Sequence, residues 1–237
     1  MEQVVLREPD AAVRHGAAAD WAAAEARLRG LPLRYAPGEP SERRTAPEGR
    51  GGTLTVVGTG SARDQDGAAG TEFALRVVSA SAGPVVVVPC RSRPAPADGE
   101  VTLGVDARAP AGAAVAFAFN TARSRRARLR AVHAWSLPRE AAVLPFAVPE
   151  EDRGGWEDQE VQLLADALRP WRERYPEVRA VPDVVLFTPV EALTRRCGTS
   201  ALLVVGRPSG KPVGRVARAL VRAARCPVAV VPSPAPR

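Results

Sequence analysis

Two apolar runs near the end of the chain, ALLVVG at residues 201–206 and PVAVVP at residues 227–232, decide the fold. Neither run alternates apolar with polar residues, which is typical of strands covered on both faces by helices in a parallel sheet. A helix is predicted between them, near residues 213–225. Strand, helix and strand in this order form a right-handed crossover unit, so the sequence predicts an α/β fold.

Upstream of these runs, residues 101–200 alternate between strand and helix in the same way. Apolar runs predict three more strands, and amphipathic stretches with turn signals predict three more helices. The predicted strands are VTLGVD (101–106), LRAVHAW (129–135) and VPDVVLF (181–187), and the predicted helices are residues 111–126, 157–175 and 189–197.

Side-chain spacing and caps define these helices further. Thr188 is the predicted N-cap of the third helix, with Pro189 as its first residue, Glu191 as reciprocal capping partner and Gly198 at its end. Pro170 is expected to kink or shorten the second helix. The first two helices are predicted to present these residues on one face each: Ala114, Phe117, Ala118 and Ala122, and Val161, Leu164, Leu168, Trp171 and Tyr175.

An internal repeat shows that the unit occurs twice. Residues 10–36 align without a gap to residues 106–132 at an offset of 96, which places Trp21 opposite Phe117 as a second predicted core anchor. LTVVGTGS aligns with LLVVGRPS at an offset of 148, with Gly58 opposite Gly206. GPVVVVP aligns with CPVAVVP at an offset of 143. The first copy is therefore shorter by 148 − 96 = 52 residues before its glycine loop.

The shortened first copy keeps four of five strands, QVVL, LPLRY, LTVVG and PVVVV. Residues 37–52 replace two helices and the third strand. The predicted organisation is a trimmed domain at residues 1–90, a linker rich in proline and charge at residues 91–100, a complete domain at residues 101–233 and a tail at residues 234–237.

Several motifs in fixed order resemble the universal stress protein family. They are Gly104-Val105-Asp106 after a strand, LRAVHAW, TPVEAL (188–193), LLVVGRPSG (202–210) and CPVAVVP (226–232). The resemblance implies flavodoxin-like parallel sheets with strand order 3-2-1-4-5, the first sheet lacking its third, edge strand. It also implies that the fifth strands, PVVVV and PVAVV, pair as an intramolecular pseudo-dimer, and a homodimer stays open.

The resemblance implies an ATP site made of an Asp after the first strand and a loop reading Gly, two residues, Gly, nine residues, Gly and Ser or Thr. Glycines of this kind let backbone N–H groups approach phosphates. In the second copy Asp106 and Gly206 match this pattern. The remaining positions depart from it: Ser209 replaces the second glycine, Gly210 comes one place late, and Gly214 and Arg215 stand for the terminal pair.

Arg215 has two interpretations. Its guanidinium could clamp a phosphate directly, or it could begin an exposed stripe with Arg218, Arg222 and Arg225.

The first copy departs from the same pattern in another way. It keeps a long loop with Gly58, Gly60 and Gly67, and its terminal pair, Gly70 and Thr71, comes one residue early. Its acidic residue is Asp10, which follows Arg7, Glu8 and Pro9, so the first strand is expected to end early. The sequence therefore predicts a degenerate nucleotide site in both copies.

The amino-acid composition narrows the other functions that the sequence allows. The formal charge of +7 comes almost entirely from arginine, with Lys211 the single lysine, and it leaves nucleic-acid binding open. The run Arg123, Arg125, Arg126 and Arg128 is interpreted as a solvated helix end. Cys90, Cys197 and Cys226 have no metal-ligand spacing and, with no apolar run long enough for a membrane helix, indicate a reduced, cytoplasmic protein.

No catalytic set is apparent. Arg63 occupies the third glycine position of a dinucleotide fingerprint, and Pro212 follows Gly210-Lys211 where a P-loop needs Ser or Thr. His133, near the end of a predicted strand, is interpreted as a core or rim residue. Three functions stay open: a non-enzymatic binding protein of the stress response, an ATP binder or weak ATPase, and an arginine-driven nucleic-acid binder.

Overall fold

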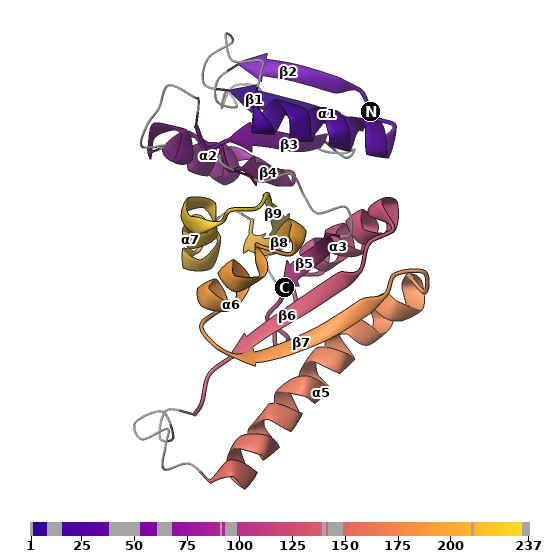
Figure 1. The fold of residues 1–237 in the computed structure, drawn as a ribbon, viewed down its shortest axis with the longest axis vertical. Coiled ribbons are helices and arrows are strands. Elements are labelled where there is room, and N and C mark those ends of the chain that lie inside the picture. Colours follow the sequence, from indigo (N-terminus) through magenta and orange to yellow (C-terminus); the bar gives the residue numbers. More distant parts are fainter. Residues whose placement is uncertain are drawn as a thin grey trace.

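The computed structural model describes residues 2–8, 16–37, 53–60, 68–90, 92, 99–138, 141, 149–209 and 211–233. Within these residues one nine-stranded sheet runs in the order β2-β1-β3-β4-β9-β8-β5-β6-β7, with helices on both faces (Figure 1). The strands are β1 (Gln3–Glu8), β2 (Leu33–Pro37), β3 (Thr53–Gly58), β4 (Val85–Val88), β5 (Glu100–Gly104), β6 (Leu129–Trp135), β7 (Ala180–Leu186), β8 (Ser200–Pro208) and β9 (Val228–Ser233).

The two predicted sheets are joined edge to edge. Strands β2, β1, β3 and β4 are parallel to one another, and so are β9, β8, β5, β6 and β7. The junction between the two sets is an antiparallel pairing of β4 with β9, in which Val86 lies opposite Ala229. Counted within the second half, the order β7-β6-β5-β8-β9 is 3-2-1-4-5.

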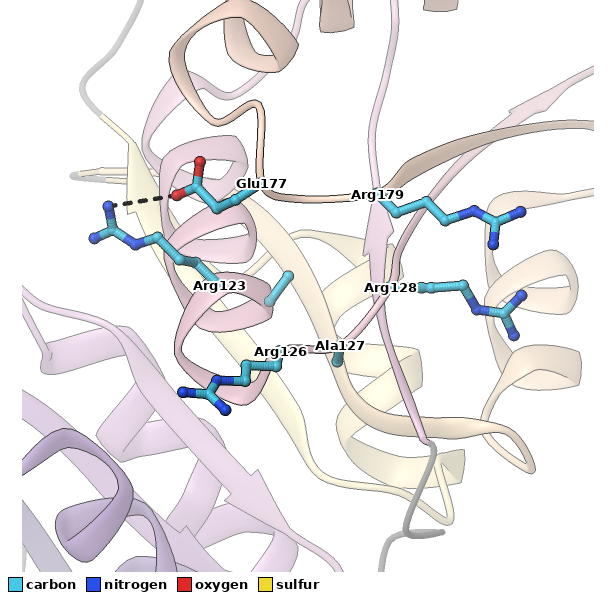
Figure 2. A pocket seen from close by; sticks show the side chains of 7 residues that line it. Arg123, Arg126, Ala127, Arg128, Glu177 and Arg179 are labelled. Carbon is cyan, nitrogen blue, oxygen red and sulfur yellow. Dashed lines mark ion pairs between the residues drawn. The ribbon is translucent and has the colours of Figure 1, made fainter.

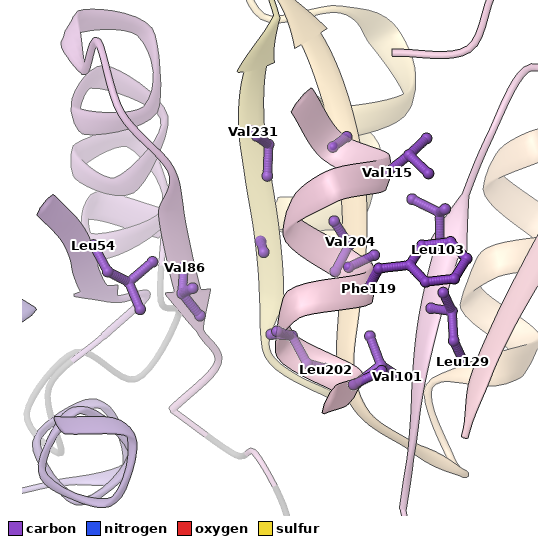
Figure 3. Close-up of a cluster of buried hydrophobic side chains, with 14 of the residues drawn as sticks. Leu54, Val86, Val101, Leu103, Val115, Phe119, Leu129, Leu202, Val204 and Val231 are labelled. Carbon is purple, nitrogen blue, oxygen red and sulfur yellow. The ribbon is translucent and has the colours of Figure 1, made fainter. Parts of the chain in front are cut away.

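Helices cover the sheet in two layers that both cross the junction. Helices α1, α3 and α5 pack over one face, and α2, α6 and α7 over the other. Each face carries one hydrophobic cluster with members from both halves, such as Leu54 and Val204 on the α1–α3 face (Figure 3). The helices are α1 (Ala17–Arg29), α2 (Ala68–Ala80), α3 (Gly112–Arg125), α5 (Glu150–Arg174), α6 (Pro189–Arg196) and α7 (Arg215–Ala223).

Helices α1 and α3 make two reciprocal arginine–aromatic contacts across the junction. Arg29 of α1 lies over the ring of Phe117 in α3 at 5.4 Å, and Arg125 of α3 lies over Trp21 of α1 at 5.6 Å. These residues are equivalent in the repeat, since 21 + 96 = 117 and 29 + 96 = 125. Glu25, which is 1% exposed, accepts hydrogen bonds from both arginines. Trp21 and Phe117 are half-buried: they pack against the hydrophobic cluster of this face, in line with the prediction, and they also contact the other half.

Helix α5 departs most from the sequence prediction. It begins at Glu150, well before residue 157, because three acidic residues in its first turn favour a helix start. Pro170 lies inside the helix and does not end it. Beyond Pro170, Trp171 and Tyr175 pack against Phe119, and this tertiary contact holds the last turn in place.

The buried face of α5 is also different from the predicted one. Val161 is 44% exposed, whereas Glu160 points inward in line with the buried Leu164 and Leu168. The sequence prediction selected the apolar residue, but the spacing of four residues from Leu164 falls on Glu160.

The ends of three elements, α6, β1 and β5, were also predicted from the sequence. Thr188 is the N-cap of α6 and accepts a hydrogen bond from the backbone of Glu191 at 3.4 Å, while the Glu191 carboxylate pairs with Arg195. Strand β1 continues through Glu8, so its predicted early end is wrong. Glu100, assigned to the linker, begins β5. Most of the predicted linker, residues 38–52 and the tail lie outside the described residues.

Candidate functional site

The predicted nucleotide site falls where two neighbouring strands of the second half end. Strand β5 lies between β6 and β8, so the crossover direction changes beside it. Ligands of open α/β sheets bind at such a switch point, outside the carboxyl ends of the strands. Gly104 at the end of β5 pairs with Val205 of β8, which brings the segments containing Asp106 and Gly206 next to each other.

Asp106 is placed on the surface in a tight turn. Its Oδ1 accepts a hydrogen bond from the backbone N–H of Arg108 at 3.0 Å, and its carbonyl accepts one from Ala109 at 3.2 Å. A carboxylate that bonds its own backbone two residues on stabilises a turn. The side chain is exposed and its second oxygen keeps acceptor capacity for a ligand.

Gly206 is packed against the helix above it. A Cβ atom at Gly206 would lie 2.6 Å from the Cβ of Ala111 and 3.4 Å from that of Ala114. Real Cβ atoms do not approach this closely, so a side chain at this position would push α3 away from the sheet. The glycine therefore has a packing role that needs no ligand.

The remaining described residues of the predicted loop have structural contacts of their own. The backbone N–H of Ser209 bonds to the carbonyl of Ser233 at 2.8 Å, which ties it to β9. Gly214 is the N-cap of α7 and makes no side-chain cap, and Arg215 is the first residue of that helix, with an exposed side chain. Gly210 lies outside the described residues.

Arg207, which the sequence analysis did not single out, is the most deeply buried cation at this end of β8. It is 4% exposed and donates a hydrogen bond to the carbonyl of Ser81, just after the last residue of α2. Burial lowers the pKa of Arg207. A cation at a helix C-terminus stabilises the orphan carbonyls there, so the second half uses this arginine to cap a helix of the first half.

In the first half the predicted glycine pair also has a structural position. Gly70 and Thr71 lie inside α2, and a Cβ atom at Gly70 would sit 2.7 Å from the amide nitrogen of Gly60 and closer still to the carbonyl of Thr59. Gly58 ends β3, where a Cβ atom would lie 3.3 Å from Ala18. The first turn of α2 thus rests directly on the backbone leaving β3. Asp10 and Gly67 lie outside the described residues.

A polar trio of two buried side chains, His133 and Glu160, and the exposed Arg108 lies behind the Asp106 turn. His133 of β6, 2% exposed, places its Nε2 3.0 Å from an oxygen of Glu160, and Glu160 also accepts from Arg108. Burial would raise the pKa of Glu160, but the hydrogen bonds from Arg108 and His133 bring it below its ordinary value. The hydrogen bond to Glu160 in turn raises the pKa of Arg108.

The trio positions the turn and offers no free base. Nδ1 of His133 lies 3.1 Å from the carbonyl of Val105 and 3.3 Å from the N–H of Ala107, so both ring nitrogens already have partners. A general base needs a nitrogen within reach of a substrate proton. The interpretation of His133 as a core residue is confirmed by its burial. Glu160 and Arg108 were missed, and the spacing of Glu160 from Leu164 was the only sequence signal for them.

At the opposite, amino end of the second-half strands lies a hollow of about 450 Å³ lined mainly by arginine (Figure 2). Arg123 pairs with Glu177 at 3.9 Å, and Arg126, Arg128 and Arg179 are exposed, with no ion pair to the described residues. In Figure 2 the side chains of Arg128 and Arg179 point the same way. The predicted arginine run thus contributes Arg123, Arg126 and Arg128 to one surface, whereas Arg125 turns to Trp21 and Glu25.

The side chains and helices of the described residues also bear on metal binding and on membrane crossing. These residues contain no group of three His, Cys, Asp or Glu side chains arranged to hold a metal ion. Among their helices, none combines the length and apolar character that a membrane crossing requires.

The sequence model of the universal stress protein family matches residues 99–232, which is more than half of the chain. The chain belongs to the universal stress protein family. The match covers the second half, from the start of β5 into β9, and the predicted resemblance to this family is confirmed.

Curated relatives agree with this assignment. Universal stress protein Rv1996 of Mycobacterium tuberculosis is 35% identical over 160 residues, which cover 64% of this chain and 50% of the relative. Universal stress protein Rv2005c of the same species is 34% identical over 114 residues, covering 46% of this chain and 37% of the relative. The chain therefore spans about half the length of the first of these relatives.

Solved structures share the fold over both halves. A universal stress protein from Archaeoglobus fulgidus DSM 4304 matches with a TM-score of 0.54 at 13% identity, covering 98% of this chain and 86% of that one. A protein of unknown function from Pseudomonas aeruginosa PAO1 matches with a TM-score of 0.53 at 16% identity, covering 98% and 82%. The prediction of an α/β fold with a mostly parallel sheet is confirmed.

Proposed function

We propose that this universal stress protein is a non-enzymatic binding protein of the stress response in the cytoplasm, and that neither half holds ATP tightly. One observation carries the proposal. The family spacing after Ser209 would place the terminal loop pair at Ala219 and Leu220, and both lie inside α7, with Leu220 fully buried. Helix α7 begins at Arg215, so the segment that would surround the phosphates is too short.

The surroundings of the two strand ends support the same proposal. Gly206 is covered by Ala111, and the cation next to it, Arg207, is turned to the carbonyl of Ser81 in the first half. Gly70 is closed off by the backbone at Thr59. The Cβ side of each of these glycines is therefore occupied by the packing of the protein itself, which explains the glycines without a phosphate ligand.

The absence of an assembled catalytic set in the described residues supports a binding role. His133 has partners on both nitrogens, and the side chains around it, Glu160 and Arg108, are paired to each other. A fold shared with other family members does not by itself indicate their chemistry. The proposed function is therefore a surface for a partner, with Asp106 and its turn as exposed polar groups.

We further propose that residues 1–90 are a trimmed copy of the unit at residues 101–233, and that the two copies pair within one chain through β4 and β9. The shared strand orders β2-β1-β3-β4 and β6-β5-β8-β9 and the exchanged contacts of Arg29 and Arg125 support this proposal. Light scattering after gel filtration should then give the 25.0 kDa mass of one chain. A dimer mass would favour pairing between chains.

Calorimetric titration with magnesium ATP tests the proposal that neither half holds ATP tightly. We expect no saturable heat at millimolar nucleotide. If heat does appear, an Asp106→Asn variant decides its origin, because removal of the carboxylate charge weakens binding only at the predicted cleft. Saturable heat that this variant abolishes would establish the alternative function, an ATP binder, and a steady release of phosphate would make it a weak ATPase.

A second candidate function rests on the hollow at the amino end. Arg126, Arg128 and Arg179 place three exposed cations without partners among the described residues around one concave surface. Phosphate backbones bind such surfaces, and the affinity falls steeply with salt. Fluorescence anisotropy with single-stranded and duplex oligonucleotides at low salt tests it. Binding that the Arg128→Ser and Arg179→Ser double variant weakens would support nucleic-acid binding, and no binding at low salt would remove it.

A further inference from the structure

Two arginines of the hollow at the amino end of the second half lie next to each other on neighbouring strands. Arg128 directly precedes β6, and Arg179 directly precedes β7. Leu129, the first residue of β6, lies opposite Ala180, and its backbone N–H bonds to the carbonyl of Arg179 at 3.1 Å. Arg128 and Arg179 are therefore at corresponding positions of two strands about 4.8 Å apart.

The guanidinium groups of these two residues form a pair of like charges. Both side chains are exposed, and neither has an ion pair with a described residue. In Figure 2 they point the same way. Like charges at neighbouring positions of adjacent strands destabilise a sheet. An anion bound between the two groups would offset this repulsion, and arginine binds phosphate oxygens in a bidentate geometry.

The two carboxylates in the walls around this pair are each held by another arginine. Glu177, in the wall of the same hollow, pairs with Arg123 at 3.9 Å. A second hollow of about 220 Å³ also has Arg128 in its wall, so the two hollows adjoin. In the second hollow Glu100 accepts a hydrogen bond from Arg130 at 2.6 Å. The charges of Arg128 and Arg179 are therefore not balanced by these carboxylates.

An arginine at position 128 is not needed to build the strand that follows it. At the repeat offset of 96, its equivalent in the first half is the uncharged Pro32, which directly precedes β2. The carbonyl of Pro32 accepts from the N–H of Val4 at 3.0 Å, and that of Arg128 accepts from the N–H of Val101 at 2.9 Å. Since the backbone makes the same bond without an arginine, the side chain of Arg128 is available for a ligand.

We propose that Arg128 and Arg179 bind inorganic polyphosphate, a linear chain of phosphate units, along the two adjoining hollows. The described residues of both walls include no aromatic side chain on which a base could stack and no Asn or Gln that could read a base edge. The walls therefore favour an anion that carries phosphates without bases. The proposal rests on the second candidate function above, which places phosphate groups in the same hollow, and it narrows the ligand.

Calorimetric titration of the full chain with sodium polyphosphate, at low salt and without magnesium, tests the proposal. The natural chain should give saturable heat, and the Arg128→Ser and Arg179→Ser double variant should lose about tenfold or more in affinity. The matched control is the Arg218→Ser and Arg225→Ser double variant, which removes the same charge from exposed positions outside both hollows and should bind like the natural chain. No saturable heat, or an equal loss in both double variants, would overturn the proposal.

A second pair of substitutions tests the geometry of binding. Lysine keeps the charge but lacks the planar fork of arginine. The Arg128→Lys and Arg179→Lys double variant should therefore bind polyphosphate with an affinity between those of the natural chain and the serine variant. Circular dichroism confirms that each variant is folded, and the lysine variant serves as the test if the serine variant is not. Full affinity in the lysine variant would contradict bidentate binding.

Competition separates this proposal from the nucleic-acid function. A thymidine oligonucleotide with the same number of phosphates should displace polyphosphate only weakly. Magnesium ATP should not displace it, because the metal neutralises part of the triphosphate charge. An oligonucleotide that binds more tightly than polyphosphate would overturn the narrower proposal and leave the nucleic-acid function in place. If neither ligand binds, both fail.

Discussion

The ends of β3 and β8 carry equivalent glycines beneath equivalent helices, but the residues that follow have different contacts. A Cβ atom at Gly58 would lie 3.3 Å from the Cβ of Ala18, and one at Gly206 would lie 3.4 Å from that of Ala114. Ala18 and Ala114 are themselves equivalent, since 18 + 96 = 114. This one contact between helix and strand is therefore the same in both halves.

The next residue of each strand end shows the difference. In the first half, Thr59 accepts a hydrogen bond from the backbone of Cys90 at 3.3 Å, at the end of its own neighbouring strand. In the second half, Arg207 reaches across the junction to the carbonyl of Ser81. The two halves have kept the packing that builds the sheet, while the chemistry of the segment beyond the glycine has diverged. Substitutions at equivalent positions of the two halves test this difference.

The largest effect is expected from Glu25→Ala at the junction of α1 and α3. Glu25 is 1% exposed and accepts from Arg29 and Arg125, so its loss leaves two partly buried cations without their carboxylate. We expect a loss of about 3 kcal/mol in the free energy of unfolding, because removing one partner of a buried ion pair is costly. Urea denaturation measures it.

Thr121→Val is the matched control for this substitution, because Thr121 occupies the equivalent position in the second half and accepts from Arg29 at 3.2 Å. Its loss should cost about 1 kcal/mol, the value of a single hydrogen bond. Equal losses of unfolding free energy for the two variants would show that the buried carboxylate of Glu25 stabilises the junction no more than the hydroxyl of Thr121 does.

Gly70→Ala should have the next largest effect, through the first turn of α2. The added methyl group would overlap the backbone at Thr59 and Gly60, which cannot move without shifting β3. Overpacking of this kind costs about 2 to 3 kcal/mol. Thermal unfolding followed by circular dichroism measures the loss. Gly154→Ala in α5 is the control, because nothing lies near its Cβ position and the change should be stabilising.

Glu160→Gln tests the trio that, among the described residues, only the second half possesses. The loss of charge-assisted hydrogen bonds to Arg108 and His133 should cost about 2 kcal/mol near neutral pH. The pKa of Glu160 is lowered in the folded state. Its contribution is therefore present above the ordinary glutamate pKa and is lost as pH falls through the lowered value.

The difference in unfolding free energy between the natural chain and Glu160→Gln should accordingly shrink towards acid pH. Urea denaturation at a series of pH values measures it. A difference that stays constant or grows on acidification would show that the carboxylate charge does not stabilise the trio.

The smallest effects compare the two glycines directly. Gly206→Ala should cost about 1 to 2 kcal/mol, because the new methyl group would lie 2.6 Å from Ala111. In Gly58→Ala the nearest described atom to the new methyl group is the Cβ of Ala18 at 3.3 Å; a small shift of α1 relieves this contact, so the cost should be less than about 0.5 kcal/mol. Differential scanning calorimetry of the two variants ranks them. The reverse ranking would mean that α3 is not held against the end of β8.

Local sequence signals predicted the strands and helix ends that depend on interactions between residues close in the sequence. The apolar run LRAVHAW coincides with β6, and Thr188 caps α6 as its side chain dictates. Helix α5 was predicted less well, because tertiary packing of Trp171 and Tyr175 on Phe119 overrides the break at Pro170. Propensity rules describe isolated helices and do not include such contacts.

The site could be predicted only in part for a similar reason. Asp106 and Gly206 were found because they match two positions of the motif that the family resemblance implies, the first just after β5 and the second near the end of β8. The contact of Arg207 with Ser81, 126 residues away in the sequence, depends on how the two halves meet. A single sequence contains no local signal for such pairs. Glu160 was overlooked because the apolar Val161 beside it fitted the expected pattern of a buried face.

A crystal structure of the full chain grown with millimolar magnesium ATP tests most directly whether both halves have lost their phosphate cradle. The account predicts that Ala111 stays against Gly206, that Arg207 stays on the Ser81 carbonyl, and that no triphosphate is bound at the end of β8 or of β3. A triphosphate held by the backbone of Ser209 to Arg215, or by the segment between Gly58 and Thr71, would contradict it.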